Sequence, residues 1–219
     1  MEHDFWAERW RNNQHGFHLD EANRHLVRHV SRLAPAPTRV FVPLCGMSRD
    51  LGFLRDLGHE VVGVEFIEEA ALRFFDENGL EPAASRLGPH PTLRADRITI
   101  ILDDLFALDA AAVGRFSAIY DRAALVAVEP DLHAAYLRKL RELAHEDARL
   151  LLIGFDHDID TGPPFSLPGP ALAALAAGLF SFEQLADLDL LPSETRFRER
   201  GATRVREQVW LGRPVVGSP

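Results

Sequence analysis

Short apolar runs alternate with amphipathic stretches along this chain, and the first two runs set the pattern. Residues 40–44, VFVPL, are apolar and rich in branched and aromatic side chains, which predicts a buried strand. A helix with an apolar stripe is expected to begin at Ser48 and to end at Gly58. Residues 60–65, EVVGVE, form a second apolar run that ends on Glu65. These elements predict a βαβ unit, in which a right-handed crossover joins two parallel strands.

The alternation of helical and strand patterns continues beyond this unit. Further helices are expected over residues 4–12, 20–33, 67–78, 130–145 and 169–178, and further strands over residues 98–102, 116–120 and 148–158. Residues 81–88 are a candidate short strand, while residues 88–97, rich in Gly, Pro, His and Arg, are expected to form a loop. Residues 181–191 and 204–212 are expected to form an antiparallel pair at the sheet edge.

Strands that alternate with helices in this way predict an α/β fold. We expect one domain over residues 1–219, with a mostly parallel sheet covered by helices on both faces. Residues 1–34 precede the first strand and are expected to form N-terminal helices that act as a lid. Two tryptophans, Trp6 and Trp10, lie in this segment, and docking of the segment on the core is the alternative role for them.

Composition and charge narrow the class of protein. The chain has 219 residues, of which 47% are hydrophobic, so it can bury the core of one large domain. Its formal net charge of −9 argues against a broad nucleic-acid surface, which needs clustered cations. No apolar run reaches membrane-spanning length, and the N-terminal residues do not resemble a signal peptide. Cys45 is the only cysteine, so no intrachain disulfide forms, and we expect a cytoplasmic monomer without membrane or nucleic-acid partners.

A ligand site is expected where the strands of the βαβ unit end, because ligands of open α/β sheets bind at the carboxyl ends of the strands. Gly46 lets the backbone of the first turn approach a ligand closely. Glu65 follows roughly 20 residues later, where an acid accepts hydrogen bonds from ribose hydroxyls. The GxGxxG pattern that cradles a pyrophosphate is missing, which favours a nucleoside without phosphates, such as S-adenosylmethionine. The alternative for Glu65 is a solvated strand end.

Acidic and basic residues also end the later strands. Asp103 and Asp104 follow residues 98–102 and are placed either to face an adenine amino group or to cap the next turn. Asp121 and Arg122 end the next strand and are placed either at the ligand site or in a structural ion pair.

No metal site is expected. His157 lies between Asp156 and Asp158, but neighbours in a strand point to opposite faces and cannot all chelate one ion. Cys45 lies in the candidate turn, where it is expected to be a small packing residue rather than a reactive thiol. The loop at residues 162–170, GPPFSLPGP, is expected to be either a stiff wall for a flat substrate or a plain connection.

Several short motifs occur together along the chain. They are FWAERW (residues 5–10), GFH (16–18) with Asn23 after it, VPLCG (42–46), GHEVVGVE (58–65), FFDENGL (74–80), FAL (106–108), YDRAAL (120–125) and GPPFS (162–166). In their order and spacing, which cover nearly the whole chain, they resemble the thiopurine S-methyltransferase family in its bacterial form. Each motif alone is weak evidence, whereas the full set is highly specific.

The resemblance implies a Rossmann-like class I methyltransferase fold, with a mostly parallel seven-stranded sheet and one antiparallel edge strand. It implies S-adenosylmethionine as methyl donor, S-adenosylhomocysteine as product and a small-molecule thiol as acceptor. The positions that match the family's cofactor contacts are Trp10, Leu44, Glu65 and Arg122, and Trp6, Gly46, Asp104 and Leu105 are expected to add contacts. Phe17 matches an aromatic residue near the acceptor. An aromatic face such as that of Trp10 attracts a sulfonium cation.

This chain departs from the family pattern at several positions. Met47 replaces a lysine, Ile67 replaces a serine, Asp103 replaces the glycine of GDFFAL, and Arg24 replaces a proline. The loop before GPPFS is also short. Glu65 and Arg122 are retained, so cofactor binding is expected, and the departures bear on acceptor range and rate.

The mechanism expected from these residues is an in-line displacement, in which a thiol or thiolate sulfur attacks the sulfonium methyl. Heterocyclic thiols ionise near neutral pH, so positioning and exclusion of water matter more than a strong base. Arg122 is expected to orient the acceptor or stabilise its anion, with Asp121 fixing Arg122. Trp6, Trp10 and Phe17 are expected to close the site.

Three other functions remain open at this level. The same scaffold suits other small nucleophiles, such as selenium or tellurium oxyanions, halide or thiocyanate. A nucleotide-dependent oxidoreductase is disfavoured by the single-glycine turn. A non-catalytic binding module is kept open by Met47 and Ile67.

Overall fold

The computed structural model describes residues 3–14, 18–160 and 162–215. The chain divides into two compact units, residues 1–119 and residues 120–219, so the single-domain organisation stays a prediction. None of the helices in the described ranges has the length and apolar character needed to cross a membrane.

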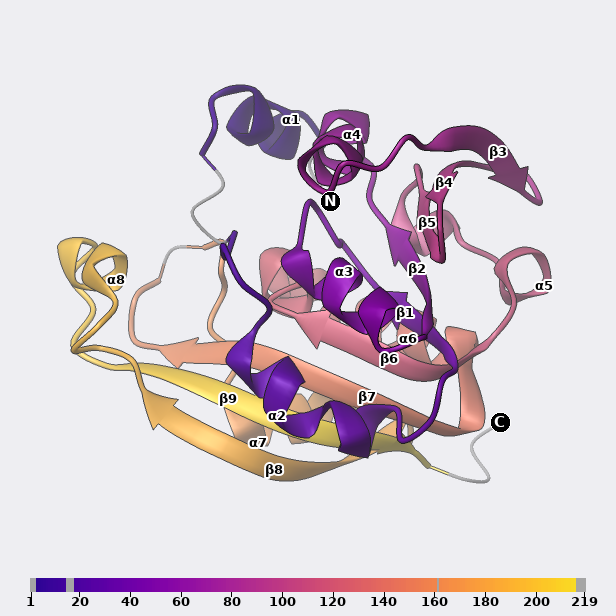
Figure 1. The fold of residues 1–219 in the computed structure, drawn as a ribbon. Coiled ribbons are helices and arrows are strands. Elements are labelled where there is room, and N and C mark those ends of the chain that lie inside the picture. The colour runs from indigo at the N-terminus through magenta and orange to yellow at the C-terminus, as the bar shows by residue number, and fades with distance from the viewer. Residues whose placement is uncertain (1–2, 15–17, 161, 216–219) are drawn as a thin grey trace. The chain divides into compact units, whose positions relative to one another are not determined.

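The first unit holds a sheet with a parallel core (Figure 1). Its strands are β1 (Arg39–Val42), β2 (Glu60–Val64), β3 (Ala83–Leu87), β4 (His90–Ala95), β5 (Ile98–Ile101) and the beginning of β6 (Phe116–Arg122). Its helices are α1 (His3–Arg11), α2 (Arg24–Leu33), α3 (Arg49–Asp56), α4 (Glu68–Glu77), η1 (Leu105–Ala107) and α5 (Ala110–Val113). β1 pairs in parallel with β2 and with β6, and β2 pairs in parallel with β5. The βαβ unit expected around α3 is therefore confirmed.

Helix starts in this unit are set by side-chain caps. The Ser48 side chain accepts a hydrogen bond from the backbone N–H of Asp50 and begins α3 as expected. α2 begins at Arg24 rather than at residue 20, because the Asn23 side chain accepts hydrogen bonds from the N–H groups of His25 and Leu26. Arg24 occupies the first helical position, which also suits the proline of the family pattern.

The sequence interpretation missed strand β4. Residues 88–97 were expected to form a loop, but His90–Ala95 pair antiparallel with β3 on one side and with β5 on the other. Pro91 is close to the start of β4, and its carbonyl accepts a hydrogen bond from Leu102 N–H over 2.9 Å. The neighbouring strands supply the pairing, and local composition does not reveal them.

The second unit is built on a long antiparallel arrangement. Its strands are the end of β6, β7 (Ala144–His157), β8 (Phe180–Asp189) and β9 (Val205–Pro214), and its helices are η2 (Leu125–Ala127), η3 (Pro130–Leu132), α6 (His133–Leu143), α7 (Gly169–Leu175) and α8 (Thr195–Glu199). β9 lies between β7 and β8 and is antiparallel to both (Figure 1). The antiparallel pair expected at the C-terminal end is confirmed.

The described residues form nine strands, two more than the resemblance implied. The β3–β4 hairpin accounts for the difference, because it adds two antiparallel strands beyond β5 in the first unit. The fold class is the expected one, a mixed α/β sheet with a parallel core and antiparallel C-terminal strands.

Candidate functional site

The carboxylate of Glu65 is turned back toward the first turn of the βαβ unit. Its Oε2 accepts a hydrogen bond from Gly46 N–H over 3.0 Å, and its Oε1 accepts one from Ile67 N–H over 2.8 Å. Only 5% of the residue is exposed. The alternative of a solvated strand end is therefore wrong.

The charge on Glu65 is costly in this environment. Burial raises the pKa of Glu65 to about 7, although the backbone N–H groups of Ile67 and Gly46 lower it by stabilising the anion. The carboxyl group therefore exchanges its proton near neutral pH. A polar ligand that donates hydrogen bonds to it would favour the ionised form.

The turn between β1 and α3 brings backbone close to Glu65. Leu44 and Gly46 both have positive φ, at 46° and 51°, so the chain reverses sharply at this point. Cys45 N–H donates to the carbonyl of Val64 over 3.0 Å and ties the turn to the end of β2. A Cβ placed on Gly63 would lie 2.6 Å from the Cys45 sulfur, so the thiol fills the space that this glycine leaves.

Cys45 is a packing residue, as expected from the sequence. It is buried, and burial raises the pKa of its thiol well above its usual value. A thiol held in its neutral form is a poor nucleophile.

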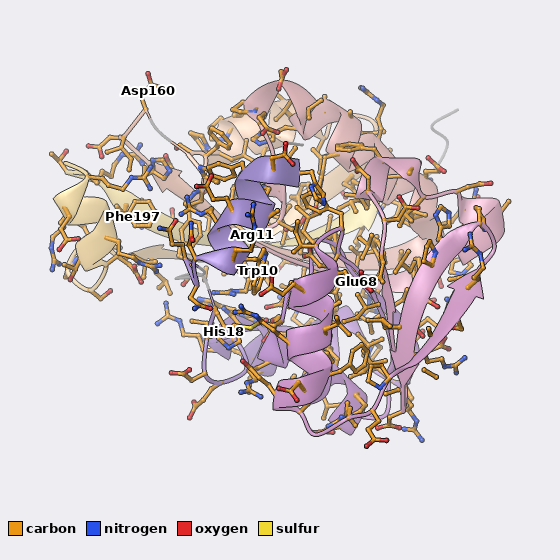
Figure 2. The ribbon with its side chains drawn as sticks, turned by 90° about the horizontal axis from the view of Figure 1, so that it is seen from above. Trp10, Arg11, His18, Glu68, Asp160 and Phe197 are labelled. Carbon is orange, nitrogen blue, oxygen red and sulfur yellow. The ribbon has the colours of Figure 1, made fainter. Side chains whose placement is uncertain are left out.

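Trp10 contacts this turn from the N-terminal helix α1. The residue is 3% exposed, and a Cβ placed on Gly46 would lie 3.2 Å from Cζ2 of its indole ring. Figure 2 shows Trp10 on α1. The turn that follows α1 is tied to α4 by a hydrogen bond of 2.7 Å from Arg73 Nη1 to Asn13 Oδ1. Trp6 is half-buried, and its ring meets that of Phe5 edge-on at 5.3 Å between centroids.

Asp50, in the first turn of α3, is a structural residue of this region. It is buried, and its Oδ1 accepts a hydrogen bond from Asn23 N–H over 2.6 Å. Its Oδ2 accepts one from the Ser48 hydroxyl over 3.1 Å. Asp50 therefore joins the start of α2 to the start of α3. The spacing Ser48-x-Asp50 signals the cap, whereas nothing local signals Asn23.

The segment after β5 holds two candidate carboxylates. Asp104 Oδ1 accepts a hydrogen bond from Phe106 N–H over 2.9 Å and caps η1, which is the turn-capping alternative. Asp103 Oδ1 accepts from Asp104 N–H over 2.7 Å, and its Oδ2 lies 2.7 Å from Nδ1 of His90. Leu105 is buried at the start of η1.

In the second unit, Asp121 does not hold Arg122. Asp121 is fully buried, and its Oδ2 accepts a hydrogen bond from the Tyr136 hydroxyl over 2.7 Å. Its Oδ1 accepts from the N–H groups of Ala124 and Leu125 over 3.1 and 3.2 Å. The expectation failed because consecutive strand residues point to opposite faces. Asp121 fixes the turn after β6 to helix α6.

Burial raises the pKa of Asp121 to about 6, and the Tyr136 hydroxyl and the two backbone N–H groups lower it. Arg122 is half-buried, and its guanidinium has no hydrogen bond or salt bridge with another residue in the ranges that the structure describes. Phe17, the expected acceptor contact, lies outside the described residues.

The GPPFS loop is anchored to its own unit. Phe165 N–H donates to the carbonyl of Val126 over 2.7 Å, and His157 N–H donates to the Ser166 hydroxyl over 2.9 Å. His157 Nε2 lies 3.0 Å from the carbonyl of Pro164. His157 therefore fastens the loop to the end of β7. The described residues contain no cluster of three or more metal-ligating side chains.

Solved structures share this architecture. One is the 1,6-didemethyltoxoflavin N1-methyltransferase of Burkholderia thailandensis, solved with 1,6-didemethyltoxoflavin and S-adenosylhomocysteine, with a TM-score of 0.66, 19% identity, and coverage of 97% of this chain and 86% of that chain. Another is TehB from Haemophilus influenzae, with a TM-score of 0.63, 12% identity, and coverage of 95% of this chain and 67% of that chain. The fold is that of the class I S-adenosylmethionine-dependent methyltransferases.

The sequence comparisons are more specific. The family model for thiopurine S-methyltransferase matches residues 1–213. The thiopurine S-methyltransferase of Pseudomonas aeruginosa strain UCBPP-PA14 is 41% identical over 214 residues, which cover 96% of this chain and 98% of the relative. The chain belongs to the thiopurine S-methyltransferase family, and the family expected from the motifs is confirmed.

Proposed function

We propose that this chain transfers the methyl group of S-adenosylmethionine to the sulfur of thiopurines or similar heterocyclic thiols. Membership of the family supports the reaction. The structural observation that carries the proposal is the buried carboxylate of Glu65 at the end of β2, turned toward the backbone of Gly46. This is where an α/β sheet receives the ribose of a nucleoside.

The residues of the first unit fit such a cofactor. The Glu65 carboxylate retains free lone pairs for ribose hydroxyls beyond the two backbone N–H groups it already accepts. Gly46 leaves no side chain between the turn and the indole of Trp10, whose face would attract a sulfonium. Leu44 and Leu105 would supply apolar contacts, Asp104 would accept a hydrogen bond from the adenine amino group, and Trp6 would help to exclude water.

S-Adenosylmethionine, when bound, supplies an electrophilic methyl group. The contribution proposed for Arg122 is to orient the acceptor and to stabilise its thiolate, because its guanidinium is charged and has no described partner. A thiol that ionises near neutral pH needs no strong general base. The proposed role of the protein is therefore to position the acceptor sulfur against the methyl group. Phe17 is proposed to contact the acceptor. Asp121 is proposed to position the turn beside Arg122 rather than to act on the substrate, because it accepts a hydrogen bond from the Tyr136 hydroxyl.

The first test is a calorimetric titration of the wild type and of Glu65→Ala with S-adenosylmethionine. We expect saturable binding by the wild type and a loss of roughly tenfold or more in the variant, since hydrogen bonds to a charged group are lost. Glu60→Ala is the matched control, because Glu60 is an exposed acid at the other end of β2. Equal affinity of the Glu65→Ala variant and the wild type would reject the proposed cofactor site.

The acceptor is tested separately. A radiolabelled methyl transfer assay would start with 6-mercaptopurine and continue with a panel of selenium and tellurium oxyanions, halide and thiocyanate. A higher kcat/KM for 6-mercaptopurine than for every other acceptor in the panel would support the proposal. Binding without transfer to any acceptor would favour a non-catalytic module. We further propose a cytoplasmic monomer with a small-molecule acceptor, and size-exclusion chromatography checks its oligomeric state.

A further inference from the structure

We propose that His90 and Asp103 form a positioning pair that sets the loop of Asp104 and Leu105 for recognition of the adenine amino group of the cofactor. This inference rests on the proposed function and deepens it. His90 does not need to touch the cofactor, since it acts through Asp103 and the backbone that Asp103 holds.

The register of the antiparallel strands brings the two residues together. β4 and β5 pair with Thr92 opposite Ile101. Continuing this pairing by two residues places His90 opposite Asp103, on the same face of the sheet because side chains repeat every two residues. The contact follows from this register, and a slip of one residue would separate the pair.

A chain of hydrogen bonds runs from His90 to the candidate adenine loop. His90 Nδ1 lies 2.7 Å from Asp103 Oδ2, and Asp103 Oδ1 accepts a hydrogen bond from Asp104 N–H over 2.7 Å. Asp104 Oδ1 in turn accepts from Phe106 N–H over 2.9 Å. One Asp104 oxygen is therefore occupied by the cap, and the direction of the other depends on the backbone that Asp103 holds.

Among the described residues, the contact with Asp103 is the hydrogen bond that the buried His90 imidazole makes. The residue is 4% exposed, and its Nε2 is buried without a hydrogen-bond partner in the part of the chain that the structure describes. A buried nitrogen without a partner destabilises the fold, and an apolar ring would avoid that cost. The bond from Nδ1 to Asp103 is what distinguishes histidine from an apolar residue at this position.

The test compares two ligands that differ only at the base. S-Adenosylhomocysteine carries the adenine amino group, and S-inosylhomocysteine carries an oxygen in its place. Calorimetry would measure both affinities for the wild type, His90→Phe, His90→Asn and Asp103→Gly. The asparagine amide places an N–H donor near the position of Nδ1, and Asp103→Gly restores the residue of the family pattern.

We expect the wild type to prefer the adenine ligand. His90→Phe and Asp103→Gly should lower affinity for S-adenosylhomocysteine about tenfold while changing affinity for S-inosylhomocysteine less than about twofold. His90→Asn should retain most of the preference. His59→Phe is the matched control, because His59 is a second buried histidine that accepts a hydrogen bond from Thr38 N–H before the amino end of β2. It should leave the preference unchanged.

Each failure has its own meaning. If the wild type binds S-adenosylhomocysteine but both His90→Phe and Asp103→Gly keep the base preference, the pair has no positioning role and the proposed function stands. An equal loss of affinity for both ligands would indicate general destabilisation and overturn the inference. No binding of S-adenosylhomocysteine by the wild type would overturn the inference together with the proposed function. If His90→Phe does not fold, Asp103→Gly decides the question.

Discussion

Gly46 N–H donates a hydrogen bond of 3.0 Å to Oε2 of Glu65. This bond joins the segments that follow the carboxyl ends of β1 and β2. The carboxylate cannot receive this donor unless its strand and the turn after β1 end at the same edge of the sheet. The same edge supplies both the backbone approach at Gly46 and the buried acid that we propose binds the ribose. The protonation state of Glu65 should therefore affect binding at the candidate site.

Cofactor affinity should rise with pH through neutrality. Burial raises the pKa of Glu65 to about 7, and hydroxyl donors bind the ionised form better than the protonated one. Affinity for S-adenosylmethionine should increase about tenfold between pH 6 and pH 8 and level off above that, as the ionised fraction does. Calorimetry across this range measures it. Glu65→Gln should show weak binding without this pH dependence, and a flat wild-type profile would contradict the assignment.

Gly63→Ala should disturb the turn that carries Gly46. The new Cβ would lie 2.6 Å from the Cys45 sulfur, which requires the turn to shift. Overpacking of this kind costs about 1–3 kcal/mol in the free energy of unfolding and should also weaken cofactor binding. Urea denaturation and calorimetry measure the two effects.

Two further variants test whether the Cys45 sulfur is the cause. Cys45→Ala combined with Gly63→Ala should regain most of the stability, which a double-mutant cycle would show as coupling. Gly52→Ala is the control, because its Cβ would meet Asn78 Oδ1 at an ordinary 3.5 Å inside helix α3. The free energy of unfolding of that variant should rise by about 0.5–1 kcal/mol. Strict additivity in the cycle would show that the clash lies elsewhere.

Asp121→Asn should change the pH dependence of stability. Burial raises the pKa of Asp121 from an ordinary 3.8 to about 6, so the folded protein binds this proton more tightly than the unfolded chain does. The wild type therefore loses stability as pH rises from 4 to 7, by on the order of 3 kcal/mol from this group, and the asparagine variant does not. Urea denaturation at pH 4, 5, 6 and 7 should show that the free energy of unfolding of the variant rises relative to that of the wild type as the pH increases. A constant difference across that range would mean that Asp121 ionises normally.

Arg122→Ala should lower turnover more than cofactor affinity. If the guanidinium stabilises the acceptor thiolate, its loss should reduce kcat roughly 10²-fold, as for other preorganised donors to an anion. Arg122→Lys should recover part of the activity by keeping the charge. Arg138→Ala, an exposed arginine of α6, is the control. Equal losses in kcat and in S-adenosylmethionine affinity would place Arg122 on the cofactor instead.

Much of the fold follows from the spacing of apolar residues. The runs around β1 and β2 are short, apolar and separated by a capped helix, so their parallel pairing was predictable. The pairing of β4 was not, because Pro91, and Gly88 and Pro89 just before the strand, mask a strand that pairs with β3 and β5. The contact of His90 with Asp103 depends on that missed register and was hidden with it.

The candidate site also combines features that the sequence predicts with features that it does not. The position of Glu65 at a strand end was readable from the sequence, but its hydrogen bond from the N–H of Gly46, 19 residues earlier, was not. The error at Asp121 was avoidable, since the two-residue period of a strand already forbids Asp121 and Arg122 from facing the same way. The bond from Asn23 to Asp50 has no sequence signal, because a backbone donor carries no residue identity.

The hydrogen bond from Asn23 N–H to Asp50 indicates where the N-terminal segment of this chain can be exchanged for that of a relative. A chimera joined before Asn23 would import a relative's first helix while leaving the buried Asp50 with its native donor. The imported piece would need only to keep Trp10 for the glycine it faces. A junction placed after Asn23 would also have to import a residue other than proline, to keep the backbone N–H, and one whose side chain caps α2. If Phe17 contacts the acceptor as proposed, such an exchange would alter acceptor preference without rebuilding the turn that faces Glu65.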